Sequence, residues 1–228
     1  TTAGAPAAQL KANSPERYTD VDGMYTPDPK IVSNAKKLES ITMEEMLELA
    51  GQGAKVMQTR AVEFANKYKV PVRVLSSFNE GSGTLISLED NGMENSLVSG
   101  IAFQKDQVKV TLHGVEDTPG TAFKILGPIS DAEIEVDVIV QNVSVDGKTD
   151  FTFTVSNEDQ EIVKKIVEDV RQKIEFKDLI IDSDIAKVSL VGVGMRSQSG
   201  VASRAFKILS DNDAVSYTHL RAHETHID

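Results

Sequence analysis

The chain has 228 residues, a charged fraction of 26% and a formal net charge of -11 at pH 7. Such acidity repels nucleic acid and anionic lipid, and no Lys/Arg cluster interleaved with aromatic residues offsets it, so we expect no nucleic-acid partner. The absence of cysteine excludes disulfides, thiolate metal sites and a cysteine nucleophile, and it fits the cytoplasm. No run of apolar residues approaches the ~18 needed for a membrane span.

The region before residue 90 is predicted to be α/β. The segment "RYTDV" (17–21) indicates a strand end, and Thr42 with Glu45 forms the pattern of a capping box for a helix that ends near Gly51. A second helix, with apolar residues from Val56 to Tyr68, ends before Pro71. Strands are expected over 72–78 and 83–88, followed by a polar linker over 89–96.

The next region predicts the order β-α-β-β-α-β, which is the ferredoxin-like arrangement. Its strands are expected at 107–115, 133–142, 150–156 and 176–182, and its helices at 119–132 and 158–174. Asn157 and Gln160 are the expected cap and capping partner of the second helix. The apolar stripe of that helix is expected to comprise Ile162, Val163, Ile166, Val167, Val170 and Ile174.

An internal repeat follows residue 182. A strand over 185–195 and a helix over 200–213 repeat the opening of the preceding unit, and "AFKIL" occurs at 122–126 and again at 205–209. The second copy then stops, because no further strand pair and no second helix follow.

The segment "YTDVDGMYTPDPK" (18–30) first raises the possibility of a calcium loop. An EF-hand counted from Asp20 requires an acid or Asn at its fifth position and Gly at its sixth, but Met24 and Tyr25 stand there. Two alternatives remain. The segment is either a solvated turn, which the spacing favours, or a ligand loop at the carboxyl end of a strand.

A second turn, "GVEDTPGTAF" (114–123), precedes a predicted helix. Free backbone N–H groups at the helix start suit a carboxylate, and Asp117 suits an ammonium group, which together would bind a free amino acid. On the residues alone, the preferred interpretation is an ordinary cap at Asp117 and an ordinary first-turn proline at Pro119.

The histidines do not indicate a metal site. His113 falls in a predicted strand and is interpreted as a packed or edge residue rather than a base. His219, His223 and His226 would share one helical face, but their segment has no apolar stripe and no clearly placed acid. No GxSxG, P-loop, GxGxxG or HExxH motif is present.

Several segments in order resemble the aspartate kinase family. "YTDVDGMYTPDPKIV", "ITMEEMLELAGQGAKVMQTRAVEFANKYKVPVRVLSSF" and "GTLI" resemble the C-terminal part of its kinase domain, and "GVEDTPGTAFKIL" to "TDFTFTV" with "KVSLVGVGMRSQSGVASRAF" resembles its paired regulatory ACT domains. The resemblance covers roughly residues 1–213. It implies an α/β fold in which the amino acid kinase part precedes ferredoxin-like (βαββαβ) ACT domains, the second of them truncated.

The resemblance implies transfer of the γ-phosphoryl of ATP, with Mg²⁺, to the side-chain carboxylate of L-aspartate, the first step toward lysine, threonine, methionine and diaminopimelate. Lys30 stands where the family has Arg, so it keeps the charge without the bidentate fork. The implied nucleotide contacts are Thr19, Asp20, Tyr25, Thr26, Pro27, Asp28, Pro29, Lys30 and Lys55. No catalytic residue is expected in this chain.

The resemblance also implies feedback inhibition by lysine, threonine or both, acting through ACT domains that pair in a homo-oligomer. The implied effector contacts are Asp117, Ile134, Glu135, Val136, Gln141, Val201 and Ala202. Inhibition then shifts the kinase part between two states of different effector affinity.

The expected divisions are a kinase part over 1–90, a first ACT domain with its linker over 91–183, a truncated second ACT domain over 184–213 and a non-native tail over 214–228. The family's N-terminal kinase half is expected to precede Thr1, so the isolated chain is expected to be inactive. A stand-alone regulatory subunit that starts near Met93 is the alternative. A free-standing ACT sensor without kinase ancestry is a third and more remote possibility.

Overall fold

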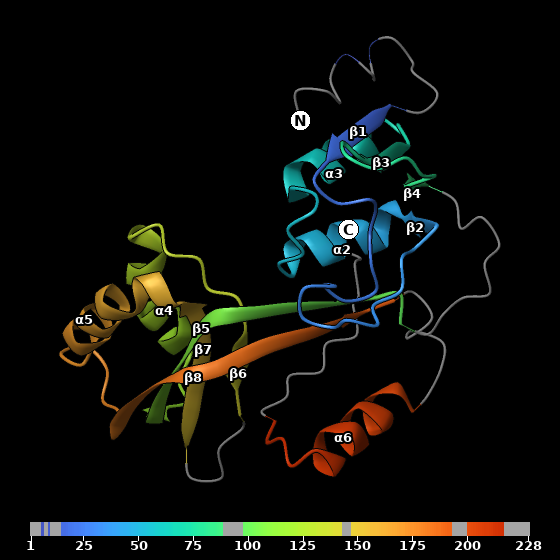
Figure 1. Cartoon of the computed structure of the whole chain (residues 1–228). Helices are drawn as coiled ribbons and strands as arrows, with labels where there is room; N and C mark the ends of the chain where they lie inside the picture. Colours follow the sequence, from blue (N-terminus) through green and yellow to red (C-terminus); the bar gives the residue numbers. More distant parts are fainter. Residues whose placement is uncertain are drawn as a thin grey trace. The chain divides into compact units, whose positions relative to one another are not determined.

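The computed structural model describes residues 15–88, 98–142, 147–192 and 200–216, together with Pro6 and Gln9. The described residues form two compact units (Figure 1), the first over Thr1–Phe103 and Val188–Ser216 and the second over Gln104–Lys187. Outside the described residues lie the whole of the expected linker over 89–96, with Met93 in it, and the three histidines of the tail. No helix among the described residues is long and apolar enough to cross a membrane.

The first unit is built on a mixed sheet of four strands in the order β1-β3-β4-β2. The strands are β1 (Glu16–Thr19), β2 (Ser40–Thr42), β3 (Val72–Ser76) and β4 (Thr84–Ser87). β1 runs parallel to β3, β3 antiparallel to β4, and β4 parallel to β2. The carboxyl ends of β1 and β3 therefore lie at the same edge as the starts of β4 and β2.

Two helices cover this sheet, α2 (Met43–Gly51) and α3 (Thr59–Lys67). The expected capping box of α2 is confirmed, because Thr42 Oγ1 accepts from Glu45 N and Glu45 Oε2 accepts from Thr42 N. The expected apolar face of α3 is wrong at Tyr68, which follows the helix and is 50% exposed. The buried core comprises Met24, Ile41, Met43, Met46, Leu49, Met57, Val62, Ala65, Val74, Ile86, Ala102 and Val191.

The second unit follows the order β5-α4-β6-β7-α5-β8, which confirms the ferredoxin-like prediction. Its elements are β5 (Gly100–Glu116), α4 (Thr121–Asp131), β6 (Ile139–Gln141), β7 (Lys148–Ser156), α5 (Gln160–Val170) and β8 (Asp178–Val191). The sheet order is β6-β7-β5-β8. The first residues of β5 and the last of β8 belong to the first unit.

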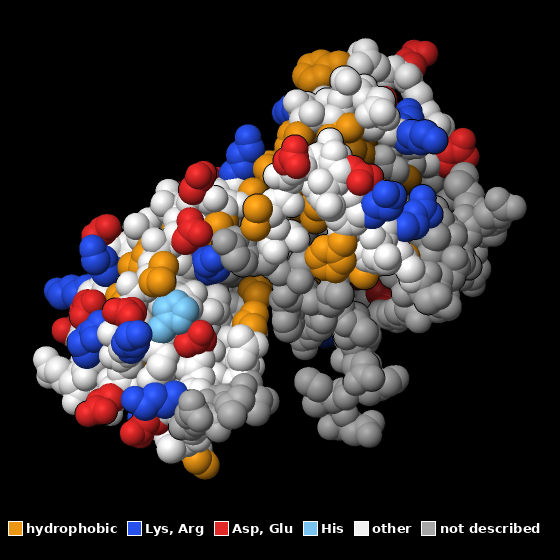
Figure 2. Space-filling view, turned by 90° about the horizontal axis from the view of Figure 1, so that it is seen from below, with side chains coloured by type: hydrophobic (Ala, Val, Ile, Leu, Met, Phe, Trp, Pro, Cys, Tyr) orange, Lys and Arg blue, Asp and Glu red, His pale blue; other side chains and the backbone are white. Residues whose placement is uncertain are grey.

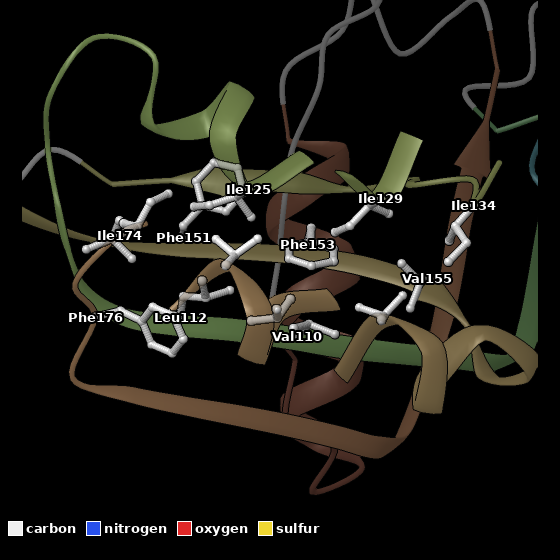
Figure 3. Close-up of a cluster of buried hydrophobic side chains, with 14 of the residues drawn as sticks. Val110, Leu112, Ile125, Ile129, Ile134, Phe151, Phe153, Val155, Ile174 and Phe176 are labelled. Atoms are coloured by element: carbon white, nitrogen blue, oxygen red, sulfur yellow. The ribbon is translucent and has the colours of Figure 1, made fainter. Parts of the chain in front are cut away.

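Alternation along β7 builds the core of the second unit, since Phe151, Phe153 and Val155 are buried and the residues between them are partly exposed. Figure 3 shows Ile125 and Ile129 of α4 over Phe151 and Phe153. Residues of α5 complete the same cluster, so both helices cover one face of the sheet. Figure 2 shows Lys and Arg side chains interspersed with Asp and Glu on the face that it displays.

Several expected boundaries in the second unit are wrong. The strand expected over 133–142 is reduced to β6, because Glu133 has a φ of 58° and Ile134 N bonds back to Ile129 O of the preceding helix. The strands expected over 176–182 and 185–195 are one strand, β8, as far as the chain is described in that region.

The start of α5 also differs from the prediction. A 3-10 turn over Asn157–Asp159 precedes the helix, and Ser156, not Asn157, supplies the capping oxygen. Ile162 is 53% exposed, whereas Val163, Val167 and Val170 of the expected stripe are buried. The helix of the repeat is α6 (Val201–Asp211), shorter than expected at both ends.

Candidate functional site

The expected ligand segment forms a hairpin between β1 and β2. Its base pairs Met24–Thr26 with Lys36–Leu38, through Thr26 N to Lys36 O at 2.9 Å, Leu38 N to Met24 O at 2.8 Å and an antiparallel bridge between Tyr25 and Lys37. The tip spans residues 27–35. The expected solvated turn is therefore a paired hairpin whose base is bonded to the first residue of β4 and whose tip carries exposed polar residues.

A buried threonine fixes the hairpin to the sheet. Thr84, the first residue of β4, accepts from Met24 N at 2.8 Å and donates to Leu38 O at 2.6 Å, so one hydroxyl holds both strands of the hairpin base. Gly23 fits closely beside it, since a Cβ at position 23 would lie 2.5 Å from Thr84 Oγ1. The sequence motif alone did not indicate Thr84, which is 60 residues away from Met24.

The hairpin tip holds Asp28, Pro29 and Lys30. Asp28 Oδ1 accepts from Lys30 N at 2.8 Å, and Asp28 O accepts from Ile31 N and Val32 N, each at 3.0 Å. These bonds form a side-chain-stabilised turn, which is a common role of Asp before proline. The Lys30 side chain is exposed, so its charge is available to a ligand.

Thr19 and Asp20 lie at the carboxyl end of β1. Thr19 Oγ1 donates to Asp20 Oδ1 at 3.0 Å, and Thr19 O accepts from Ser77 N at 2.8 Å, which joins the ends of β1 and β3. A shallow hollow of about 660 Å³ borders these strand ends. The described residues that line it include Tyr18, Leu75 and Phe78, and none of them is an expected nucleotide contact.

Lys55 lies in the turn between α2 and α3. Ala54 N bonds to Leu49 O at 2.9 Å, and Leu49 packs so closely on Gly100 that a Cβ there would lie 2.8 Å from Leu49 Cδ1. The next residue, Ile101, donates its N–H to Thr26 O at 2.6 Å. Residues 100 and 101 thus contact Leu49 of α2 and Thr26 of the hairpin base, respectively.

Carboxylates near the hairpin do not make a metal cluster. Within the described ranges, no group of three or more His, Cys, Asp or Glu side chains is arranged to hold a metal ion. Asp22 instead accepts from the Tyr25 hydroxyl at 2.8 Å, and this bond lowers the pKa of Asp22 and raises the pKa of Tyr25.

The second expected site lies in the turn between β5 and α4. Asp117 Oδ1 accepts from Gln141 Nε2 at 3.2 Å, and Asp117 N donates to Gly147 O at 2.9 Å. The structure therefore brings together two expected effector residues, one in the turn after β5 and one at the end of β6. Asp117 is not the helix cap and Pro119 is not in the first turn, because α4 begins at Thr121 after Gly120, which has a φ of 90°.

The other expected effector residues lie in two further segments, one before β6 and one at the start of α6. Ile134 is buried in the core, Val136 packs against it and Glu135 is exposed, all in the irregular segment before β6. Val201 and Ala202 begin α6, which belongs to the first unit. Gly200 before α6 has a φ of 97°, the same left-handed start as Gly120, so the repeated sequence has a repeated local geometry.

A bulge in β5 carries an ion pair that the sequence did not indicate. The register with β7 shifts between Leu112 and Val115, and Asp150 Oδ1 there accepts from Gly114 N at 3.1 Å. His113 Nδ1 lies 3.0 Å from Asp150 Oδ2, so His113 is a half-exposed residue paired with an acid. The Gly114 bond, with His113, lowers the pKa of Asp150.

Comparisons with known proteins agree with this arrangement. The amino acid kinase family matches residues 1–76, and the ACT domain matches residues 110–175. An aspartate kinase from Pseudomonas fluorescens is 58% identical over 211 residues, which cover 92% of this chain. The chain belongs to the aspartate kinase family. It spans about half the length of the curated aspartate kinases that it matches, 51% in this instance.

Solved aspartate kinases share the fold. The enzyme from Clostridium acetobutylicum superposes with a TM-score of 0.82 at 24% identity, over 92% of this chain and 48% of that one. E. coli aspartokinase III in complex with aspartate and ADP gives a TM-score of 0.73 at 26% identity, over 92% and 47% of the two chains. The fold class expected from the sequence is thereby confirmed.

Proposed function

We propose that this chain is the part of an aspartate kinase that carries one wall of the ATP site together with amino-acid-binding regulatory domains. The complete enzyme converts ATP and L-aspartate to 4-phospho-L-aspartate, at the head of lysine, threonine, methionine and diaminopimelate biosynthesis, in the cytoplasm. The proposal is supported chiefly by the hairpin that follows β1: its base is fixed by Thr84 at the start of β4, and its tip carries Asp28, Pro29 and Lys30, which are exposed.

In this proposal Lys30 and Lys55 supply positive charge to the phosphates, since phosphoryl transfer is catalysed largely by positioning and charge stabilisation. Both side chains are exposed. Thr19 and Asp20 contact the nucleoside end, and Tyr25 to Pro29 complete the nucleotide loop. Because E. coli aspartokinase III is described in complex with aspartate and ADP, a nucleotide at this site is consistent with a structural relative.

Bound Mg²⁺ would neutralise charge on the phosphates. The described residues offer no cluster of ligating side chains, so no residue of this chain is assigned to the metal. The part of the reaction left to these residues is to orient the nucleotide and to balance its charge. The isolated chain is therefore proposed to be inactive.

The proposed effector site is the turn that joins Asp117 to Gln141. Its carboxylate and amide, beside the N-terminal end of α4, suit the ammonium and carboxylate groups of a free amino acid. Lysine, threonine or both are the proposed effectors, with Ile134, Glu135, Val136, Val201 and Ala202 as further contacts. Pairing of ACT domains in a homo-oligomer is proposed to transmit the inhibition.

The stand-alone regulatory subunit that starts near Met93 is not better supported. Such a subunit would exclude the hairpin, whereas the match to aspartate kinases covers 92% of this chain.

Calorimetric titrations of the chain would test both sites. MgATP binding should weaken at least tenfold in Lys30→Ala and Lys55→Ala, and lysine or threonine binding should be lost in Asp117→Ala and Gln141→Ala. Each pair serves as the control for the other ligand. Unchanged MgATP affinity in both lysine variants would contradict the nucleotide assignment, and unchanged amino-acid affinity in Asp117→Ala would contradict the effector assignment.

A further inference from the structure

Asp22, Tyr25 and Lys37 form a side-chain cluster at the base of the hairpin. The Tyr25 hydroxyl donates to Asp22 Oδ1 at 2.8 Å, and Lys37 Nζ lies 3.4 Å from Asp22 Oδ2. Each carboxylate oxygen thus has its own partner, so the orientation of the Asp22 side chain is fixed. Asp22 and Lys37 are not among the expected nucleotide contacts.

The backbone around this cluster is fixed as well. Tyr25 and Lys37 stand opposite each other in an antiparallel bridge, so the lysine that reaches Asp22 comes from the residue paired with the tyrosine. Gly23 packs against the Lys37 stem, since a Cβ at position 23 would lie 3.2 Å from Lys37 Cδ. Met24, between Gly23 and Tyr25, is tied to Thr84. Tyr25 is consequently held at its backbone and at its hydroxyl.

This arrangement determines which part of Tyr25 can meet a ligand. The hydroxyl proton is committed to Asp22, so the phenol offers a nucleotide its ring rather than a donated hydrogen bond. The same bond raises the pKa of Tyr25, which keeps the hydroxyl protonated and donating well above neutral pH. It also lowers the pKa of Asp22, which keeps the acceptor charged.

We propose that Asp22 is a positioning residue for the nucleotide, which holds the Tyr25 ring in place by accepting its hydroxyl hydrogen, with Lys37 holding the second carboxylate oxygen. The inference rests on the proposed nucleotide role of the hairpin and assigns a task within it. Asp22 acts through Tyr25 and does not itself touch the nucleotide.

A double-mutant cycle on the full chain tests the coupling, with MgATP titrated into the millimolar range and followed by NMR. Asp22→Ala and Tyr25→Phe should each weaken MgATP binding about fivefold, the factor supplied by one hydrogen bond of ordinary net strength, and the double variant should be no weaker than either. Asp22→Asn keeps an acceptor oxygen and should restore most of the affinity. Asp169→Ala on α5 is the matched control and should leave affinity unchanged.

A second readout separates positioning from a general loss of structure. Ultraviolet titration of the tyrosines should show one phenol whose titration moves to lower pH in Asp22→Ala, and this transition should be absent in Tyr25→Phe. Additive losses in the cycle, an unmoved titration, or MgATP affinity unchanged by Asp22→Ala would overturn the inference alone. Failure of the unsubstituted chain to bind MgATP would instead contradict the proposed nucleotide site, and with it the role given to Asp22.

Discussion

Lys30 carries the exposed positive charge at the tip of the hairpin, and its main chain is already fixed by Asp28. Lysine presents a point charge, whereas arginine presents a planar fork that can bind a phosphate through two hydrogen bonds. Lys30→Arg should therefore tighten MgATP binding several-fold, and Lys30→Met should weaken it, as measured by calorimetry. Equal affinities for the Lys, Arg and Met forms would exclude a phosphate contact at this position.

Asp150 contacts Gly114 N and His113 at the bulge in β5. Its pKa is lowered in the folded state by the Gly114 N–H and by His113, so its stabilisation is present above the ordinary carboxyl pKa of about 3.9 and is lost as pH falls through the lowered value. At pH 6 the thermal unfolding midpoint of the unsubstituted chain should be higher than that of Asp150→Asn, and the difference should shrink as the pH falls below about 3.9. A difference that stays constant over this range would contradict the assignment.

The residues that the sequence could predict are those carried by a local motif or by the family resemblance. The resemblance implies Asp117 and Gln141 as effector contacts, and the structure adds that the two side chains are hydrogen-bonded to each other. Thr84 and Asp150 could not be found in this way, because their side chains bond to segments far away in the sequence. Thr84 bonds to Met24, 60 residues away, and Asp150 bonds to Gly114, 36 residues away. Asp22 is part of the motif at 18–30, but only the folded hairpin shows that its carboxylate accepts a hydrogen bond from the Tyr25 hydroxyl.

Among the helices and strands, the sequence predicted best those whose defining residues lie close together in the chain. The capping box of α2 is present as expected, and the βαββαβ order of the second unit is confirmed. The misses are elements set by tertiary pairing. β2 has three residues, too few for a periodic pattern, and β8 continues through a polar stretch, "DSD", that resembles a turn.

The capping box also supports a stability prediction. Thr42→Ala removes the oxygen that accepts from Glu45 N and should lower the free energy of unfolding by about 1 kcal/mol in urea titrations. Thr59→Ala at the start of α3, where Gln58 makes no side-chain cap bond, is the matched control and should have a smaller effect. Equal losses in the two variants would mean that the capping box does not stabilise α2.

At the scale of the molecule, the described residues divide into two units; the first contains the residues that match the amino acid kinase family, and the second contains those that match the ACT domain. The expected domain boundaries at 90, 183 and 213 stay predictions. Since the chain spans 51% of an aspartate kinase to which it is 58% identical, its proposed role needs residues that the relative has and this chain does not show. Alone, it should form no acyl phosphate from ATP and aspartate.

The most direct test joins this chain to the preceding half of the Pseudomonas fluorescens aspartate kinase and measures acyl phosphate formation, trapped as the hydroxamate. We expect aspartate-dependent turnover in the joined protein, loss of that turnover in Lys55→Ala, and no turnover in either half alone. A joined protein that folds, as judged by cooperative unfolding, but shows no aspartate-dependent turnover would contradict the proposal that this chain supplies one wall of a kinase site.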